Sequence, residues 1–441
     1  MNTRKLLFYS LSVALGGFLF GFDTAVISGA EEYIQNLWNL SDVLHGFTVA
    51  VALYGTVIGA LSGGIPSDKL GRKRTLFWIG VTYFISAVGS ALAPDKITFM
   101  IFRFLGGLAV GASSVTAPMY ISEIAPASSR GKLVAMFQLN IVIGILIAYV
   151  SNYLIQGLGE HSWRWMLGIE AFPALIFSIS VIFISESPRW LIVKKNNVEQ
   201  AESVFAGFQM NKSEIKDSIS EIKNSILIEK SGKQESLLSK KFRFPLILAL
   251  LFAFFNQFAG INAIIYYAPR IFKMTGLETS TAFLSTAGIG LTNMIFTVFG
   301  IFLIDRAGRK ILMFIGSVGL FINLLLVARA FYTGVFNGVE MFLFFYIAFF
   351  AISQGAVIWV FISEVFPNQV RASGQSAGSF THWILAAIIA NIFPYFVNLI
   401  GAAPIFILFA VMMCLQLLYV LILMPETKNI TLEELEKRLI K

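Results

Sequence analysis

The chain has 441 residues, of which 57% are hydrophobic and only 13% are charged. A soluble globular protein carries about 25% charged residues, so this composition excludes an ordinary soluble domain. The net charge is +8, but the basic residues lie between apolar runs, where membrane topology explains them better than nucleic acid does. The single cysteine, Cys414, excludes a disulfide framework, and the three histidines lack metal-ligand spacing. No cofactor or metal is therefore expected.

Apolar runs long enough to cross a bilayer, which takes about 20 residues, recur along the whole chain. We predict twelve helical spans, near 7–29, 46–65, 75–93, 97–121, 132–156, 165–185, 245–268, 281–304, 311–331, 340–363, 375–398 and 403–424. A signal peptide is the alternative for the first run. That run is too long for the apolar region of a signal peptide, which has about 7–15 residues, so it is expected to be a span.

The stretch 186–244 between the sixth and seventh spans is polar, with eleven Lys/Arg and eight Asp/Glu. Isoleucines recur in it at helical spacing, and Ser187-Pro188 is a typical helix start. The isoleucines are Ile215, Ile219, Ile222 and Ile226. We predict two or three short amphipathic helices here, with a solvated tether as the alternative. In the tail, Thr431 and Glu434 form a capping-box pattern that predicts another short helix.

Basic residues between the spans are strongly biased to one side of the predicted membrane. With the N-terminus in the cytoplasm, that side holds Arg4, Lys5, Lys69, Arg72, Lys73, Arg74, Arg130, Lys132, the eleven of the central stretch, Arg306, Arg309, Lys310, Arg371, Lys428, Lys437, Arg438 and Lys441. The other side holds Lys96, Arg164, Arg270, Lys273 and Arg329. The positive-inside rule therefore places both termini in the cytoplasm.

The chain repeats itself with a period near 240 residues. Asp68-Lys-Leu-Gly-Arg-Lys73 recurs 237 residues later as Asp305-Arg-Ala-Gly-Arg-Lys310. Glu123 with Arg130 recurs as Glu364 with Arg371, and Glu186 as Glu426. We therefore expect an all-α fold, with twelve transmembrane helices in two pseudo-symmetric six-helix bundles. The expected domains are 1–190 and 245–424 for the bundles, 191–244 for a cytoplasmic helical linker domain and 425–441 for a tail helix.

Such a duplicated fold is typical of secondary transporters, which rock two halves about a site near the bilayer midplane. Acid–base pairs that bridge the halves would stabilise the state closed on the cytoplasmic side and break in the other. The predicted gate consists of Asp68, Arg72, Glu123, Arg130, Glu186, Asp305, Arg309, Glu364, Arg371 and Glu426. The alternative, that these charges only determine topology, does not explain the ordered acid-Gly-base pattern that occurs twice.

Several segments of the chain form an ordered set that covers nearly its whole length. They are GFLFGFDTAVISGA, GGIPSDKLGRKR, RFLGGLAVG, PMYISEIAPASSRGKL, SESPRWL, NQFAGINAIIYYAP, DRAGRK, WVFISEVFPNQVRASG and PETK. Taken together, they resemble the sugar porter family of the major facilitator superfamily, and within it bacterial proton-coupled sugar symporters such as xylose symporters. The resemblance implies transport of a monosaccharide, and no nucleophile–base pattern of an enzyme stands out.

Neutral polar and aromatic side chains within the spans are the candidate substrate site. Amides offer both donors and acceptors to sugar hydroxyls, although a single amide within a span is more often a contact between helices. The resemblance implies that Gln138, Gln257, Asn262, Asn293 and Trp359 contact sugar and that Phe20 and Tyr266 flank it. The predicted substrate site also includes Asn256, His382 and Trp383.

Three positions depart from the family pattern. Asn256 stands where the family usually has Gln, and His382 where it commonly has Gln or Asn. Ala356 follows Gly355 where the family usually has Gly-Pro, so we expect span ten to lose a helix breaker. These departures leave the identity of the sugar open.

Two charged residues lie within spans, Asp23 in the first and Arg103 in the fourth. Ionisable groups inside a membrane are costly and indicate function by default. The resemblance implies that they form the proton-coupling pair, with separation of the pair promoting protonation of the carboxyl. A fixed structural ion pair is the alternative.

We therefore expect a proton-coupled hexose or pentose symporter of the cytoplasmic (inner) membrane that works by alternating access. Its expected partners are a sugar, a proton and membrane lipid, but not nucleic acid, and it is expected to be a monomer. The alternatives are a passive sugar facilitator, a polyol or inositol porter, and a sugar sensor that does not transport.

Overall fold

The computed structural model describes residues 3–126, 129–208, 210–231, 236–367, 369–430 and 432–439. The chain divides into two compact units. The first consists of Met1–Asp23, Gly55–Gly144 and Leu167–Lys233, and the second of Thr24–Tyr54, Ile145–Met166 and Gln234–Lys441. Four of the boundaries fall within the helices α1, α2, α6 and α7, so several spans contribute to both units. The predicted domain limits, which follow the repeat, stay a prediction.

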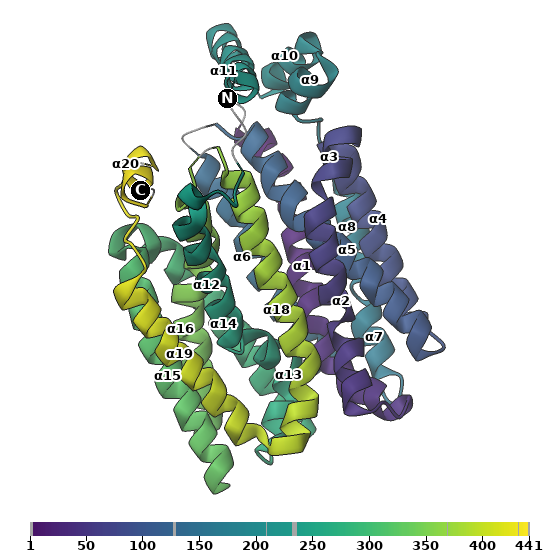
Figure 1. The fold of residues 1–441 in the computed structure, drawn as a ribbon. Coiled ribbons are helices and arrows are strands. Elements are labelled where there is room, and N and C mark those ends of the chain that lie inside the picture. The colour runs from purple at the N-terminus through teal and green to yellow at the C-terminus, as the bar shows by residue number, and fades with distance from the viewer. Residues whose placement is uncertain are drawn as a thin grey trace. The chain divides into compact units, whose positions relative to one another are not determined.

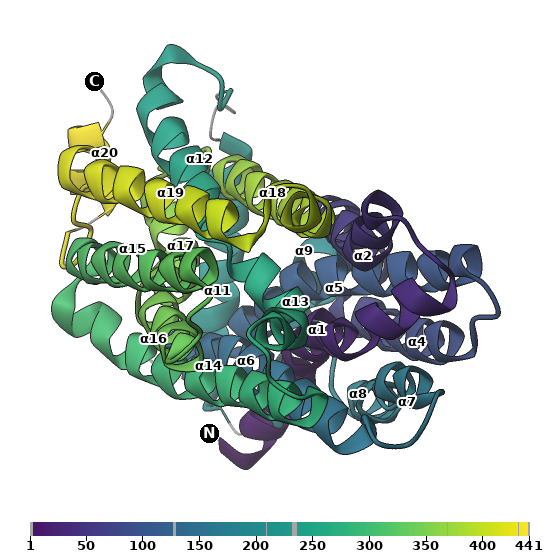
Figure 2. The same cartoon turned by 90° about the horizontal axis from the view of Figure 1, so that it is seen from below.

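The first unit is built from the first six spans and a short connecting helix. Its helices, some of which continue into the second unit, are α1 (Thr3–Leu37), α2 (Asp42–Ser62), α3 (Gly64–Leu70), α4 (Arg72–Leu92), α5 (Lys96–Ile124), α6 (Arg130–Ile155), α7 (Ser162–Gly168) and α8 (Ala171–Ile182). Helix α4 packs against α5 and α8, as Figures 1 and 2 show.

Three helices follow the sixth span, as predicted for the central stretch. They are α9 (Pro188–Lys195), α10 (Val198–Gly207) and α11 (Lys212–Ser231). Ser187 caps α9 by accepting the Trp190 N–H at 3.2 Å. A small apolar core of Trp190, Leu191, Phe205 and Ile219 joins the three helices, so this segment is folded rather than a tether. The side chain of Ile226 lies outside the described residues.

The second unit contains the last six spans and the tail helix. Its elements are η1 (Lys240–Phe242), α12 (Arg243–Phe258), α13 (Ile261–Met274), α14 (Thr279–Ala307), α15 (Arg309–Thr333), α16 (Val339–Phe350), η2 (Ala351–Gly355), α17 (Ala356–Glu364), α18 (Arg371–Ile400), α19 (Ala402–Ile422) and α20 (Leu432–Leu439). Helix α15 packs against α16 and α19, and Figures 1 and 2 show these helices side by side. The predicted tail helix is present, whereas Thr431 of its predicted cap lies outside the described residues.

Two of these spans are interrupted. Gly260 separates α12 from α13 in a left-handed conformation, with φ +86°. A Cβ atom there would meet the Phe409 ring at 2.4 Å, so the break requires glycine. Span ten changes to a π-helical turn at Ala351–Gly355. At Ala356 the helix continues into α17, without the proline breaker of the family pattern, and the π turn distorts it by a shift in hydrogen-bond register.

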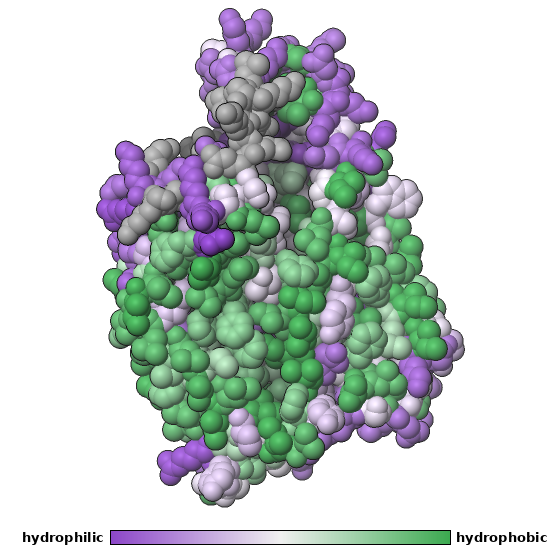
Figure 3. Space-filling model, in the orientation of Figure 1, coloured by the Kyte–Doolittle hydropathy of each residue, from purple (hydrophilic) through white to green (hydrophobic). Residues whose placement is uncertain are grey.

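Within the described residues, twelve helices are long and apolar enough to cross a membrane, as predicted. Three spans, Ser162–Ile182, Lys240–Met274 and Val339–Glu364, each consist of successive helical segments. Large apolar side chains lie exposed along α19, and Figure 3 shows a continuous apolar surface there. They include Leu408, Val411, Leu415, Leu418 and Ile422. Such an outward apolar face is suited to contact with lipid.

Candidate functional site

A chain of amide side chains lies at the break between α12 and α13 in the second unit. The Gln257 amide nitrogen donates to Oδ1 of Asn256 at 2.9 Å, and Asn262 donates to the Gln257 oxygen at 2.6 Å. All three side chains are buried. Because Gly260 ends one helix and allows the next to start, residues on both sides of the break face one another. The structure thus brings together three of the predicted substrate residues.

His382 of α18 is hydrogen-bonded to Gln257 and so adds an imidazole to these amides. The Gln257 amide nitrogen lies 3.0 Å from Nδ1 and 3.2 Å from Nε2 of the imidazole. A neutral imidazole has one acceptor nitrogen, so it can accept one amide proton and donate its own elsewhere. The amide and imidazole groups together present several donors and acceptors within one small volume. This set suits a ligand that carries several hydroxyl groups.

Two indole rings flank the imidazole. The ring centroids of Trp359 and His382 lie 4.9 Å apart, and those of His382 and Trp383 lie 4.7 Å apart. Trp359 on α17 is 36% exposed, whereas Trp383 is buried. An exposed indole face beside an amide cluster is suited to stack on the apolar face of a sugar ring.

The other predicted substrate residues lie on four helices, α1, α6, α13 and α14. Tyr266 is buried on α13, and Asn293 is buried on α14, where it accepts from Thr297 at 3.4 Å. Gln138 and Phe20 belong to the first unit, on α6 and α1. Gln138 is half-buried and Phe20 is buried.

The predicted pair of Asp23 and Arg103 forms in the first unit. Arg103 donates from Nη1 to the Asp23 carboxylate and from Nη2 to the Asp23 backbone oxygen, the latter at 3.1 Å. The two residues are only 2% and 1% exposed. Such burial makes the charge of each dependent on the other.

A third charged residue, Glu170 between α7 and α8, completes this buried cluster. Its carboxyl interacts with both Asp23 and Arg103. Two carboxyl groups and one guanidinium are electrically neutral together only when one carboxyl carries a proton. Sequence reasoning missed Glu170, although the rule that selected Asp23, an ionisable residue inside a predicted span, applies to it as well.

The duplicated charges form a tight network in the first unit. Arg72 donates two hydrogen bonds to Glu123, at 2.9 and 3.0 Å, and one to Asp68 at 3.1 Å. Glu186 accepts the backbone N–H groups of Arg72 and Lys73 at 2.9 and 3.1 Å. A carboxylate at the N-terminus of α4 satisfies amides that have no helical partner.

The second unit repeats this network residue for residue. Arg309 donates to Glu364 at 2.9 Å and to Asp305 at 3.2 Å, and Glu426 accepts the N–H groups of Arg309 and Lys310, both at 3.0 Å. Here, however, Arg309 Nε has no hydrogen-bond partner among the described residues. The contact with Glu364 is therefore single where that of Arg72 with Glu123 is double.

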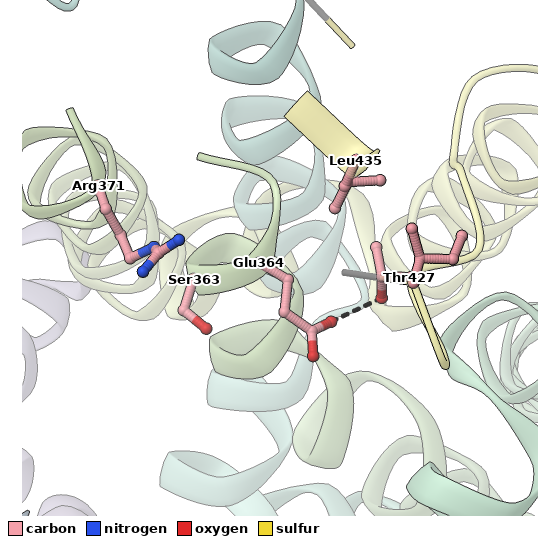
Figure 4. A pocket seen from close by; sticks show the side chains of 6 residues that line it. Ser363, Glu364, Arg371, Thr427 and Leu435 are labelled. Atoms are coloured by element: carbon pink, nitrogen blue, oxygen red, sulfur yellow. Dashed lines mark hydrogen bonds between the residues drawn. The ribbon is translucent and has the colours of Figure 1, made fainter. Parts of the chain in front are cut away.

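Arg371 lines a cavity of about 330 Å³ beside the second network. Figure 4 shows Thr427 and Glu364 pointing toward each other, with Arg371 on the far side of Ser363. Arg371 donates from Nε to the Phe366 backbone oxygen at 3.1 Å. Its counterpart in the first unit, Arg130, is exposed at the start of α6.

The two equivalent glutamates differ in electrostatics. Burial raises the pKa of Glu186, against the opposing effect of N–H donors from Ser187, Lys73 and Arg72. Burial acts in the same direction on Glu426 but is outweighed. The N–H groups of Lys428, Arg309, Lys310 and Thr427 together lower its pKa. The folded structure thus stabilises the charged form of Glu426 and disfavours that of Glu186 relative to an ordinary glutamate.

Comparisons with known proteins agree with this architecture. The family model described as "Sugar (and other) transporter" matches residues 9–439. The arabinose-proton symporter of Bacillus subtilis is 37% identical over 98% of this chain and 94% of its own length. The galactose-proton symporter of Escherichia coli K12 is 35% identical over 100% and 96%.

A solved structure of the xylose transporter of Escherichia coli, in a partially occluded inward open conformation, is also similar. It is 34% identical, covers 97% of this chain and 100% of its own, and superposes with a TM-score of 0.86. A family match over nearly the whole length, together with relatives above 30% identity, establishes both the fold and the class. The chain belongs to the sugar transporter family of the major facilitator superfamily, a family of multi-pass membrane transporters and not of enzymes.

Proposed function

We propose that the chain is a proton-coupled monosaccharide symporter of the cytoplasmic membrane that works by alternating access. The observation that carries this proposal is the buried cluster of Asp23, Arg103 and Glu170. A passive sugar carrier needs no titratable carboxyl inside the membrane, whereas a symporter needs one whose proton affinity changes with conformation. The names of the relatives, which are proton symporters for arabinose and galactose, support the same proposal.

The substrate site in this proposal combines residues of both halves. Gln257, Asn256 and Asn262 would bind hydroxyl groups, with His382 holding the Gln257 amide. Trp359 and Trp383 would contact the ring, with Tyr266 and Phe20 beside it. Gln138 and Asn293 would add further amides. The mutual hydrogen bonds of the amide cluster support this role, because a sugar can replace them by equivalent ones.

The orientation in this proposal places both networks, around Arg72 and Arg309, and both termini in the cytoplasm. The distribution of Lys and Arg between the spans supports this orientation. Arg130 and Arg371 would take part in ion pairs between the halves at this end. These pairs would form in one transport state and break in the other. Lipid surrounds the spans, and one chain suffices for the cycle, because both halves of the site are present in it.

Uptake into proteoliposomes tests the coupling. With an inward proton gradient, the purified chain should accumulate labelled sugar, and a protonophore should abolish accumulation while leaving sugar exchange intact. Asp23→Asn should lose accumulation and keep exchange. Accumulation that survives collapse of the gradient would refute proton coupling, and exchange without accumulation in the wild type would identify a passive facilitator.

A binding screen tests the substrate class. Hexoses, pentoses and inositols should be compared on wild type, Gln257→Ala and a control, Asn323→Ala. Asn323 is a buried amide of the same unit that donates to the Gly319 backbone oxygen of its own helix. The sugar that is carried should bind wild type and control alike and lose about tenfold or more in affinity with Gln257→Ala, because buried amides would be left unpaired. If no sugar distinguishes Gln257→Ala, the site assignment fails.

A further inference from the structure

The second unit has a second charged cluster at the end opposite Asp305. Helices α13 and α14 meet at that end, since α13 ends at Met274 and α14 begins at Thr279. Arg270 on α13 donates to both carboxylate oxygens of Glu31 on α1, at 3.0 and 2.7 Å. His45 on α2 lies 2.7 Å from Glu31 through Nε2. The side chains of Glu31 and His45 are 1% and 0% exposed.

This cluster joins spans from the two sequence halves. Glu31 and His45 belong to the first two spans and Arg270 to the seventh. In the same unit, Lys273 pairs with Glu32 at 2.6 Å, and Asn391 donates to the Tyr54 hydroxyl at 3.1 Å. Because alternating access separates the halves at each end in turn, these contacts must break when this end opens.

The backbones approach closely at the same place. A Cβ atom on Gly46 of α2 would lie 1.8 Å from the Asn391 backbone oxygen on α18. The Tyr149 hydroxyl of α6 donates to the Ile265 oxygen of α13 at 2.8 Å. The buried Glu31 and His45 therefore lie beside a closely packed contact, where low exposure to water strengthens an ionic pair.

The hydrogen bonds fix the protonation of His45. A carboxylate only accepts, so Nε2 carries the proton that His45 donates to Glu31. Nδ1 is buried and has no hydrogen-bond partner among the described residues. A second proton on Nδ1 would be unsatisfied, and the resulting cation would lie 3.5 Å from Nη2 of Arg270. The closed arrangement thus accommodates the neutral ring.

Other titratable and charged groups near His45 come from the same helices. On α13 the Tyr267 ring lies 6.1 Å from the imidazole, and Lys273 neutralises Glu32 of α1. Gln35 of α1 accepts from Arg270 at 2.5 Å and donates to Asp42 of α2 at 3.3 Å. Glu31, already paired with Arg270, is the anion in direct contact with His45, and Arg270 is the facing cation that opposes a charge on the ring.

We propose that Glu31, His45 and Arg270 form an outer lock, and that His45 is a proton-binding site that releases it. With His45 neutral, the lock holds the outer end closed. A proton taken up by the ring during a transient opening leaves a cation that no longer fits beside Arg270, so the lock does not re-form. This inference rests on the proposed transport cycle and adds a proton site distinct from Asp23. Acid outside would then favour the state that loads sugar and proton from outside.

Thiol labelling from outside tests the lock without any sugar. In a Cys414→Ala background, a cysteine at Asn391 reports opening, and a cysteine at the exposed Leu158 is the control for the pH dependence of thiol chemistry. A membrane-impermeant thiol reagent is applied to cells at pH 7.5 and 5.5. The labelling rate at 391 relative to 158 should rise about tenfold from pH 7.5 to pH 5.5, because acid favours the protonated ring that releases the lock.

Two variants separate the lock from its proton site. His45→Gln keeps a donor for Glu31 but does not titrate, so its relative labelling rate should be low and independent of pH. Arg270→Gln removes the cation and should give fast labelling at both pH values. Two results would overturn the proposal. One is a relative labelling rate that does not change with pH in the protein that retains His45, and the other is a pH dependence that persists in His45→Gln. The labelling experiment measures no transport. Its result can therefore be interpreted even if the uptake experiment shows that the chain is not a proton symporter.

Discussion

A Cβ atom added to Gly71 would lie 2.2 Å from Oε2 of Glu186. Gly71 also has φ +100° and ψ 161°, a backbone conformation essentially restricted to glycine. Its counterpart, Gly308, has φ +94° and ψ 162°, and a Cβ atom there would lie 2.6 Å from Oε2 of Glu426. The same arrangement thus occurs in both halves. A glycine without a side chain leaves room for a glutamate, distant in sequence, to bind the start of a helix.

Gly71→Ala and Gly308→Ala should each lower thermal stability for two reasons, backbone strain and displacement of the glutamate. The strain alone amounts to about 1–3 kcal/mol. Thermal unfolding in detergent, followed by tryptophan fluorescence, measures the loss. Gly64→Ala is the control, because Gly64 is helical and a Cβ atom there meets nothing within 4 Å. Equal stability of all three variants would show that neither the conformation nor the contact matters.

The glutamates themselves should respond differently to removal of charge. Because the pKa of Glu186 is raised, its charge works against folding, and Glu186→Gln should leave stability at pH 7 nearly unchanged. The pKa of Glu426 is lowered, so its charge stabilises the fold above about pH 4.5, and this contribution is lost as the pH falls through the folded value. Glu426→Gln should therefore lower stability at pH 7, by a modest amount because the carboxylate is partly exposed to solvent.

Unfolding temperatures measured at pH 7 and at pH 4 separate these effects. The deficit of Glu426→Gln relative to wild type should shrink at pH 4, while Glu186→Gln should match or exceed wild type at pH 7. A Glu186→Gln variant less stable than Glu426→Gln at pH 7 would reverse the assignment.

The number of spans and the duplicated charged motifs could be predicted from the sequence, because both depend on local patterns. The motifs were expected to supply pairs that bridge the halves, whereas the hydrogen bonds of Arg72 and Arg309 with Glu123 and Glu364 lie within each unit. Hydropathy over about 20 residues is a local property, and Asp68 to Lys73 recurs as a contiguous motif. The start of α9 at Ser187-Pro188 was likewise predictable from capping chemistry.

Other features depend on contacts that no local pattern contains. Glu31, His45 and Arg270 lie on three helices and carry no shared motif, so only the fold brings them together. The π turn at Ala351–Gly355 arises from a register shift in hydrogen bonding that is invisible to a search for proline. The pairing of Gln257 with His382 joins two spans that are 125 residues apart.

Glu170 should set the pH at which transport occurs. Replacing its carboxyl by an amide leaves a cluster of one carboxylate and one guanidinium, which is neutral without a bound proton, so the cluster binds a proton less readily. In Glu170→Gln, half-maximal proton-driven uptake should move to lower pH. Uptake measured from pH 5 to 8 at a fixed membrane potential checks this shift. An unchanged profile would assign Glu170 a purely structural role, and Glu160→Gln, outside the predicted spans, serves as the control.

His382 should position the Gln257 amide through its acceptor nitrogen. His382→Phe keeps an aromatic ring beside Trp359 but removes the acceptor, so the Gln257 amide loses a hydrogen bond worth about 1 kcal/mol, and KM should rise about fivefold. His382→Asn supplies an oxygen acceptor in its place and should restore much of the affinity. Because sugar exchange needs no proton gradient, exchange kinetics at pH 7 isolate this effect from coupling. If His382→Phe and His382→Asn have equal KM values, the ring acts by shape alone and does not orient Gln257.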